Sequence, residues 1–227
     1  MAEHFDIYDE RGYGIGRAAR PDVHALGLWH HTFHCWLVRR TGEGSARILF
    51  QKRCLDKDTN PGCYDITAAG HLSAGETVRD AAREMREEIG WSVPFEQLSY
   101  YGDLREEDEG FARSVHYVDR EISSVYGCVT EFPLGSFRLQ KEEVAGIYEA
   151  DADELIDLML DKRKTVSAAG AAYRDLGDGE SMSMEQEEAL ASVVAEIRAE
   201  DFVPREREYY VDIFRFLKGL ALNESSR

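Results

Sequence analysis

Cysteine is scarce in this chain, and the few cysteines present are scattered. The 227 residues contain four, and no two of them are separated by only two residues. This spacing excludes the paired-cysteine ligands of a structural zinc site and gives no sign of a disulfide framework. A protein with such cysteines is expected to be reduced, as cytoplasmic proteins are.

Long hydrophobic runs are also missing. The first residues, MAEHFDIYDERG, are polar and lack the apolar centre of a signal peptide. No apolar run approaches the roughly 18 residues that a membrane-spanning helix needs. We therefore expect a soluble cytoplasmic protein without a membrane partner.

Positive charge is the third shortage. Lysine and arginine number 27 against 44 aspartates and glutamates, so the net charge is −17. A surface of this sign repels a phosphate backbone, which argues against nucleic acid as the partner. Hydrophobic residues make up 43% of the chain, enough for a sizeable core. The length fits one large domain, or one domain with an appendage.

The hydrophobic pattern predicts an α/β fold with a mixed sheet. The predicted strands are 5–8, 14–18, 31–40, 47–54, 64–70, 97–104, 112–119, 121–131 and a short one after 144; the predicted helices are 77–89, 151–160, 186–200 and 204–222. Residues 164–186 are rich in small and polar residues and are predicted to be a linker or loop. We expect a domain over 1–160 and a C-terminal helical extension over 161–227, packed on the same domain.

The helix predicted over 77–89 has clear ends and two different faces. Thr77 and Asp80 form the pattern of a capping box, and Gly90 stands where a left-handed cap ends a helix. An apolar stripe recurs at helical spacing, and at about 100° per residue the acidic residues fall on the opposite side. The apolar stripe is Val78, Ala82, Met85 and Ile89; the acidic residues are Asp80, Glu84, Glu87 and Glu88.

Three carboxylates so close together suit a hard divalent cation. Glu84, Glu87 and Glu88 follow a loop that carries Gly70. Mg²⁺ or Mn²⁺ prefers carboxylate oxygens, and such ions commonly carry a diphosphate. A solvated acidic helix face, balanced by neighbouring arginines, is the plainer alternative for an isolated pattern of this kind.

Residues 70–91 resemble the Nudix box, G-x5-E-x7-R-E-U-x-E-E-x-G-U, where U is a bulky apolar residue. The matching positions are Gly70, Glu76, Arg83, Glu84, Met85, Glu87, Glu88, Gly90 and Trp91. Only six residues, 77–82, separate Glu76 from Arg83, whereas the box has seven. The resemblance implies a Nudix α/β/α sandwich, MutT-like and metal-dependent, that hydrolyses a small-molecule diphosphate.

The resemblance also implies roles for residues of the box. Glu87 and Glu88 are the expected metal ligands, and Glu84 is expected to be a ligand or the base that activates water. Arg83 would orient the glutamates through an ion pair, and the Gly70 carbonyl could face the metal. A glutamate from a later loop often completes such a site, and Glu143 is favoured here over its neighbour Glu142.

Similarity extends over residues 5–158, to the Nudix domains related to isopentenyl-diphosphate isomerase, including one fused to a peptidase domain in plants. The isomerases carry a Cys-Gly-His triplet with a catalytic cysteine and a metal-binding histidine. Here the triplet is Ala69-Gly70-His71, and His30 aligns with another metal-binding histidine. Alanine can neither donate nor accept a proton, which disfavours isomerase chemistry. His30 and His71 could still form a second metal or substrate site.

Basic residues precede the box. Lys52, Arg53 and Lys57 form a positive cluster in an acidic chain, and the resemblance implies contact with the diphosphate. Surface solubility is the alternative. An aromatic stripe over 209–216 is typical of core or of a dimer contact, so a homodimer is one assembly that the sequence allows.

Three hypotheses for function follow. The first is a pyrophosphohydrolase acting on nucleoside diphosphates linked to another moiety, or on related organic pyrophosphates. The second is an isomerase of isopentenyl diphosphate, and the third is a module that binds nucleotide or metal without turnover. Nothing in the loops outside the box identifies the substrate.

Overall fold

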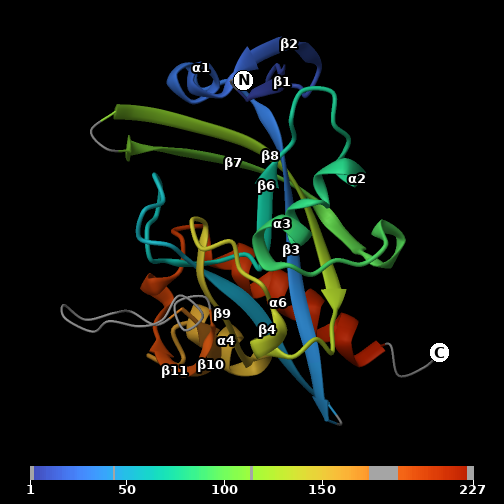
Figure 1. Ribbon diagram of the computed structural model, residues 1–227, viewed down its shortest axis with the longest axis vertical. Helices are drawn as coiled ribbons and strands as arrows, with labels where there is room; N and C mark the ends of the chain where they lie inside the picture. The colour runs from blue at the N-terminus through green and yellow to red at the C-terminus, as the bar shows by residue number, and fades with distance from the viewer. Residues whose placement is uncertain (1–2, 43, 113–114, 174–188, 224–227) are drawn as a thin grey trace.

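A computed structural model describes residues 3–42, 44–112, 115–173 and 189–223. Its centre is a nine-stranded mixed sheet whose main order is β11-β10-β9-β4-β3-β8-β7, with β5 paired to β4 and β6 to β3 (Figure 1). The strands are β3 (His30–Gly42), β4 (Ser45–Arg53), β5 (Tyr64–Asp65), β6 (Ala68–His71), β7 (Ser99–Ala112), β8 (Val115–Val129), β9 (Val144–Asp151), β10 (Val166–Ala172) and β11 (Ala191–Ile197). The central pair β3–β8 is parallel, whereas the other pairs are antiparallel.

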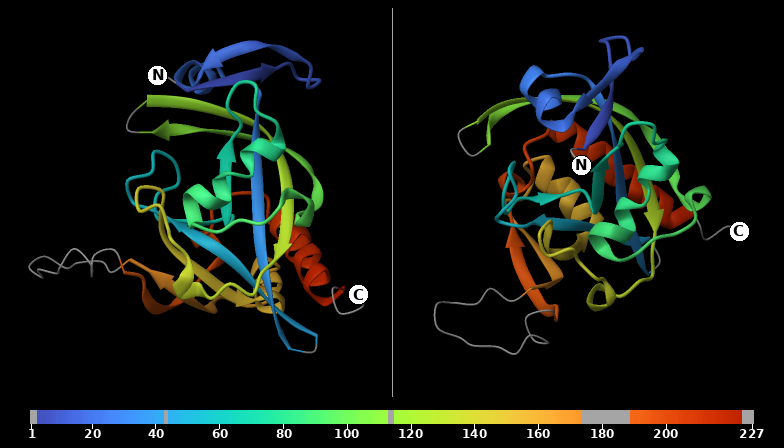
Figure 2. Two further views of the ribbon diagram at one scale, coloured as in Figure 1. Left: turned by 45° about the vertical axis from the view of Figure 1, so that its right-hand side comes forward. Right: turned by 45° about the horizontal axis from the view of Figure 1, so that its top comes forward.

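A separate two-stranded hairpin lies across one end of this sheet. It is formed by β1 (His4–Tyr8) and β2 (Gly14–Ala19), as predicted, and is followed by α1 (Arg20–Leu26). Figure 2 shows the long β7–β8 hairpin extending beneath these N-terminal elements. The N-terminal segment therefore covers the end of the sheet at which β3 begins, opposite Glu121 of β8.

Helices cover both faces of the sheet, which confirms the predicted α/β/α class. The helices are α2 (Val78–Ala81), α3 (Glu84–Ile89), α4 (Ala152–Met159) and α6 (Arg207–Asn223), with short 3₁₀ turns η1 (Phe95–Gln97), η2 (Leu134–Ser136) and η3 (Ala199–Asp201). Because side chains alternate along a strand, β3 sends Phe33 to the face that packs on Met85 of α3 and Trp36 to the face that packs on Phe214 of α6. Figure 1 shows α3 in front of β3 and α6 behind it.

Two predicted elements in the last third are wrong. The predicted loop 164–186 contains strand β10, and the predicted helix 186–200 contains strand β11 and the turn η3. Residues 174–188 lie outside the described part of the chain. The helix predicted over 204–222 is present as α6, and that over 151–160 as α4, where the Asp151 side chain caps the N-terminus by accepting from Asp153 and Glu154.

The region after residue 160 is therefore built into the sheet. Strand β10 pairs with β9, and β11 pairs with β10. The predicted strands 112–119 and 121–131 are also one strand, β8. A domain boundary at residue 160 stays a prediction, and the helical extension expected after it is a mixture of strands and helix.

Within the described residues, none of the helices combines the length and apolarity that crossing a membrane would require.

Candidate active site

The helix of the predicted metal site is present but interrupted. It forms as α2 and α3, with Ala82 and Arg83 in a turn between them. Thr77 caps α2 reciprocally with Asp80, as the sequence predicted. The Arg83 N–H donates to the Asp80 carbonyl only three residues back, at 3.1 Å. A tightened turn of this kind accommodates the spacing that is one residue short.

Arg83 is the centre of an ion-pair cluster. Its guanidinium contacts both carboxylate oxygens of Glu76, at 3.0 and 3.1 Å, and Glu87 at 2.9 Å. It also pairs with Glu84. One cation thus holds three carboxylates at the junction between loop and helix, and Glu76 reaches the cluster despite the short spacing.

Glu88 is oriented differently from the sequence prediction. It was expected on the solvent side of the helix, but only 6% of it is exposed. Its Oε2 accepts from the Ala69 N–H at 3.0 Å and from Gln51 Nε2 at 3.3 Å. Because α3 lies against β6, the side that carries Glu84 and Glu88 faces the sheet and Glu87 is left more exposed. Burial raises the pKa of Glu88 to about 8.

Gly70 allows this close approach. A Cβ at position 70 would lie 2.2 Å from the Glu84 Cδ atom, so any larger residue there would force the Glu84 side chain to move. Burial also raises the pKa of Glu84. The carboxyls of Glu84 and Glu88 therefore lie against the backbone of residues 69–70. A cation bound there would offset the cost of removing these two groups from water.

The later loop brings Glu143 to the same place. Its carboxylate pairs with Lys57, and both groups influence the pKa of Glu88. The Glu142 carbonyl accepts instead from Cys54 Sγ at 2.7 Å. Of the two candidate glutamates, Glu143 is the one whose carboxylate is tied to the basic loop beside the helix.

The other two basic residues are committed elsewhere. Arg53 donates to the Thr59 carbonyl at 3.2 and 3.0 Å and to Asp65 Oδ2 at 3.0 Å, and so fastens the loop over residues 54–63. Lys52 lies over the ring of Tyr64, 5.8 Å from its centroid. A direct contact of either residue with a diphosphate remains a prediction.

The donors around α3 fit a hard cation in kind. They are the carboxylates of Glu84, Glu87, Glu88 and Glu143 with the Gly70 carbonyl. Oxygen-only donor sets suit Mg²⁺ or Mn²⁺. In the part of the chain that the structure describes, however, the groups of three donors spaced within 4.8 Å lie elsewhere, because Arg83 holds Glu84 and Glu87.

Two of these groups of three donors overlap in a cluster of histidines and carboxylates, here called the histidine cluster. It consists of His24, His30, His71, Asp119 and Glu121. Asp119 Oδ1 lies 3.6 Å from His24 Nε2 and 3.5 Å from His30 Nε2, and Glu121 Oε1 lies 3.5 Å from His71 Nε2. The three imidazoles have metal-ligand spacing, and so do His30, Asp119 and Glu121.

The electrostatics of the histidine cluster favour metal binding. Burial lowers the pKa of all three histidines, so their rings are neutral, the form that binds metals. The Leu28 carbonyl accepts from His30 Nδ1 at 3.0 Å, which leaves Nε2 to face the cluster. Among the described residues, the Nε2 atoms of all three rings and Asp119 Oδ1 are buried without a hydrogen-bond partner. Unsatisfied buried donors and acceptors that converge in this way fit a bound cation.

Sequence reasoning found His30 and His71 but missed the other three members. His24 is on α1, and the two carboxylates are on β8, where Glu121 lies opposite His30 in the parallel pairing with β3. The alternation of Asp119, Glu121 and Ser123 along one strand was the available signal, because all three point to one face.

A buried ionic network from the C-terminal region lies beside this cluster and was also missed. Arg205 donates to Asp65 at 2.7 Å and to Glu106 at 2.9 Å, and Asp65 in turn binds Arg53. Although burial raises it, the two guanidinium groups hold the pKa of Asp65 at about 2. The network links the segment before α6 to the basic loop at the site.

Comparison with known proteins agrees with this fold. The family model of the NUDIX domain matches residues 28–169. The chain is 34% identical over 218 residues to an uncharacterised Nudix hydrolase of Clostridium acetobutylicum, covering 96% of this chain and 98% of that one. It is also 35% identical over 152 residues to Nudix hydrolase 3 of Arabidopsis thaliana, covering 64% of this chain but only 19% of that protein.

The fold is shared with solved structures of low sequence identity. A crystal structure of a Deinococcus radiodurans protein, DR0079, aligns with a TM-score of 0.50 at 20% identity, over 70% of this chain and 90% of that one. The Nudix fold and the box on α2 and α3 define a Nudix hydrolase as the class of enzyme. With the family match over more than half of its length, this chain belongs to the Nudix family.

Proposed function

We propose that this chain is a Mg²⁺- or Mn²⁺-dependent pyrophosphohydrolase that cleaves a diphosphate linkage in a small molecule by attack of water. Its substrate is a nucleoside diphosphate linked to another moiety, or a related organic pyrophosphate. One observation supports this most: buried Glu88 accepts from the Ala69 N–H, the Glu84 side chain packs against Gly70, and the charges of the Lys57–Glu143 pair act on the pKa of Glu88.

Different residues of the protein would bind the cation, orient the carboxylates and bind the phosphate. Glu84, Glu87, Glu88 and the Gly70 carbonyl would hold the cation, which when bound neutralises the diphosphate and lowers the pKa of water. Arg83 orients the carboxylates of Glu76, Glu84 and Glu87 through its ion pairs. Lys57 offers a positive charge to a phosphate oxygen, and Arg53 and Lys52 would add to the positive charge only by leaving their present partners, Asp65 and the Tyr64 ring.

A base must accept the proton of the attacking water. Glu143 and Glu84 are the two candidates, and burial raises the pKa of Glu84, which makes its carboxylate a stronger proton acceptor. Comparing the two glutamine variants assigns the role, because loss of the base lowers kcat more than it weakens cation binding.

The decisive experiment is hydrolysis of nucleoside diphosphate sugars, dinucleoside polyphosphates and prenyl diphosphates during titration with Mg²⁺ and Mn²⁺. Glu87→Gln tests the site without disturbing the core, because 44% of the Glu87 side chain is exposed. Glu96→Gln is the matched control, because the Glu96 side chain is 65% exposed and pairs with Arg79, away from the Arg83 cluster. Undiminished hydrolysis by Glu87→Gln would contradict the proposed metal site.

The histidine cluster favours a second candidate function, isomerisation of isopentenyl diphosphate. The resemblance to the isomerase-related Nudix domains, including the plant peptidase fusion, points the same way. Ala69 opposes it, since the position that carries a cysteine in isomerases holds a methyl group. Incubation with isopentenyl diphosphate decides between the two: formation of the allylic isomer would replace hydrolysis as the proposal.

The cluster itself is proposed to hold a separate cation. Three neutral imidazoles and two carboxylates form a mixed nitrogen and oxygen set, which suits a transition metal such as Zn²⁺ or Mn²⁺ better than Mg²⁺. Metal analysis of purified protein tests this, with His24→Ala expected to lose the metal. Equal metal content in the two proteins would reject it.

A further inference from the structure

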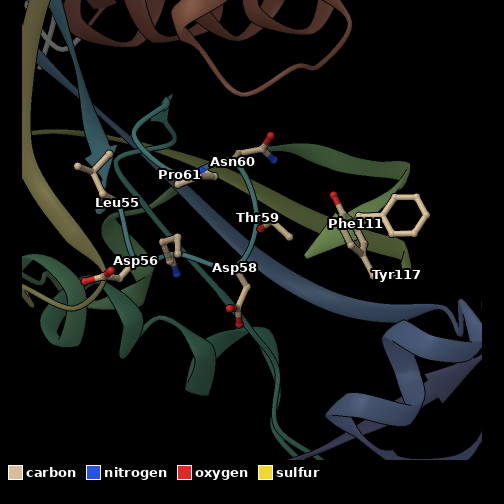
Figure 3. Close-up of a pocket in the computed structure, with 9 residues that line it drawn as sticks. Leu55, Asp56, Asp58, Thr59, Asn60, Pro61, Phe111 and Tyr117 are labelled. Atoms are coloured by element: carbon tan, nitrogen blue, oxygen red, sulfur yellow. The ribbon is translucent and has the colours of Figure 1, made fainter. Parts of the chain in front are cut away.

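A pocket of about 450 Å³ opens beside the proposed diphosphate site and shares only Lys57 with the residues of the catalytic proposal. One wall is the loop over residues 55–61, and the other is the β7–β8 hairpin with Phe111 and Tyr117 (Figure 3). We call it the hairpin pocket. Its size lies within the range typical of small-molecule sites, which is about 300–1,000 Å³.

The hairpin pocket adjoins the residues proposed to bind the diphosphate. Lys57 lines it and also pairs with Glu143 of the proposed site. Thr59 lines it too, and its carbonyl and hydroxyl bind Arg53. In Figure 3 the Thr59 side chain points from the loop toward the hairpin. A diphosphate on Lys57 would therefore direct whatever group it carries into this pocket.

The lining fits a polar group that includes a planar ring. Phe111 is 74% exposed, and Tyr117 is held in place by its hydroxyl, which donates to Asp108 Oδ2 at 2.7 Å. Exposed rings present faces on which another ring can stack. The opposite wall is mostly polar, with Asp56, Asp58, Thr59 and Asn60 beside Leu55 and Pro61, and the Thr59 hydroxyl and the Asn60 amide can form hydrogen bonds with a polar ligand. A saturated hydrocarbon chain would gain little in such a lining.

We propose that the hairpin pocket binds the organic group joined to the diphosphate, and that it selects polar, ring-bearing groups over prenyl chains. This rests on the proposed function, because the diphosphate must lie at Lys57 for the pocket to be reached. Phe111 is then a specificity-determining residue, since its ring meets the part of the substrate that does not react.

The test uses Phe111→Leu, which removes the ring, and Phe111→Tyr, which keeps it. Both changes are on an exposed side chain, so folding should be unaffected. Tyr13→Leu is the control, because Tyr13 is 69% exposed on the other hairpin. For ADP-ribose hydrolysis we expect Phe111→Leu to raise KM roughly tenfold with little change in kcat, as loss of one stacked ring predicts. Phe111→Tyr and Tyr13→Leu should keep the wild-type KM.

Binding is measured separately from hydrolysis, so that the two proposals can fail independently. Calorimetry with the α,β-methylene analogue of ADP-ribose reports the pocket even if no bond is cleaved. A weaker Kd in Phe111→Leu alone supports the pocket whatever the activity. No binding by the wild type, the same Kd in Phe111→Leu and wild type, or preferred binding of geranyl diphosphate would overturn it.

Discussion

At the scale of single residues, Gly70 is where one methyl group should matter most. Gly70→Ala would place a Cβ 2.2 Å from the Glu84 side chain and push that carboxylate from the cluster. A displacement of about 1 Å costs on the order of 100-fold in rate at an active site, so we expect that loss of kcat/KM.

Gly102→Ala is the matched control for this change, because a Cβ there meets nothing within 4 Å. Both variants should have circular dichroism spectra like the wild type. If Gly70→Ala kept full activity, the close packing of Glu84 on residue 70 would have no part in catalysis.

Asp65 makes a prediction about pH. Its folded pKa of about 2 lies below the ordinary 3.8, so its contribution to stability is fully present above pH 3.8 and is lost as pH falls through 2. That shift corresponds to about 2 kcal/mol. Asp65→Asn leaves Arg205 and Arg53 without their shared partner and should lower the unfolding free energy by about 3 kcal/mol at pH 7.

Urea unfolding at a series of pH values measures this difference. The gap between wild type and Asp65→Asn should narrow below pH 3.8. Asp153→Asn removes a carboxylate that is 64% exposed and paired with Lys218, and should change stability little. A gap that stayed constant down to pH 2 would contradict the ionic role of Asp65.

At the scale of elements, the sequence predicted correctly those helix ends that depend on capping by neighbouring residues. The capping box of α2 and the left-handed Gly90 after α3 were predicted from neighbouring residues. Strand β11 was misread as helix, although residues 191–197 alternate between inward and exposed positions. Its strand state depends on pairing with β10, and such pairing is made by residues distant in sequence.

Helix α6 should prove to be part of the same folding unit as the sheet. Phe214 is fully buried and its ring meets Trp36 of β3, with centroids 5.6 Å apart. Phe214→Ala should cost about 3–5 kcal/mol in urea unfolding, because it leaves a cavity in the core. The neighbouring Arg215→Ala, exposed to 59%, should cost less than about 0.5 kcal/mol. Equal, small effects would mean that the C-terminal region folds apart from the sheet.

At the scale of the whole molecule, the two proposed cation sites should affect stability independently. A cation that binds only the folded protein raises the unfolding free energy, by about 2.7 kcal/mol at a hundred times its Kd. Removal of both cations by a chelator should lower the Tm, and adding back Mg²⁺ should reverse only part of that decrease.

Variants separate the two contributions. His30→Ala should abolish the increase in Tm given by Zn²⁺ and keep that given by Mg²⁺, whereas Glu87→Gln should do the reverse. Thermal unfolding with each metal in turn measures both. If either variant removed both increments, the sites would not be independent.

The sequence by itself determined the class of this protein. The spacing of glycine, arginine and glutamates from Gly70 to Gly90 is a local pattern, set by one loop and one helix, so it predicted the box and its Arg83 ion pairs. Only the tertiary structure decided which carboxylates are buried and what gathers beside them. Glu88 turns inward because α3 lies on β6, and His24, Asp119 and Arg205 reach the site from α1, β8 and the segment before α6. Contacts between residues this far apart in the chain depend on sheet order and register, and no local spacing contains that information.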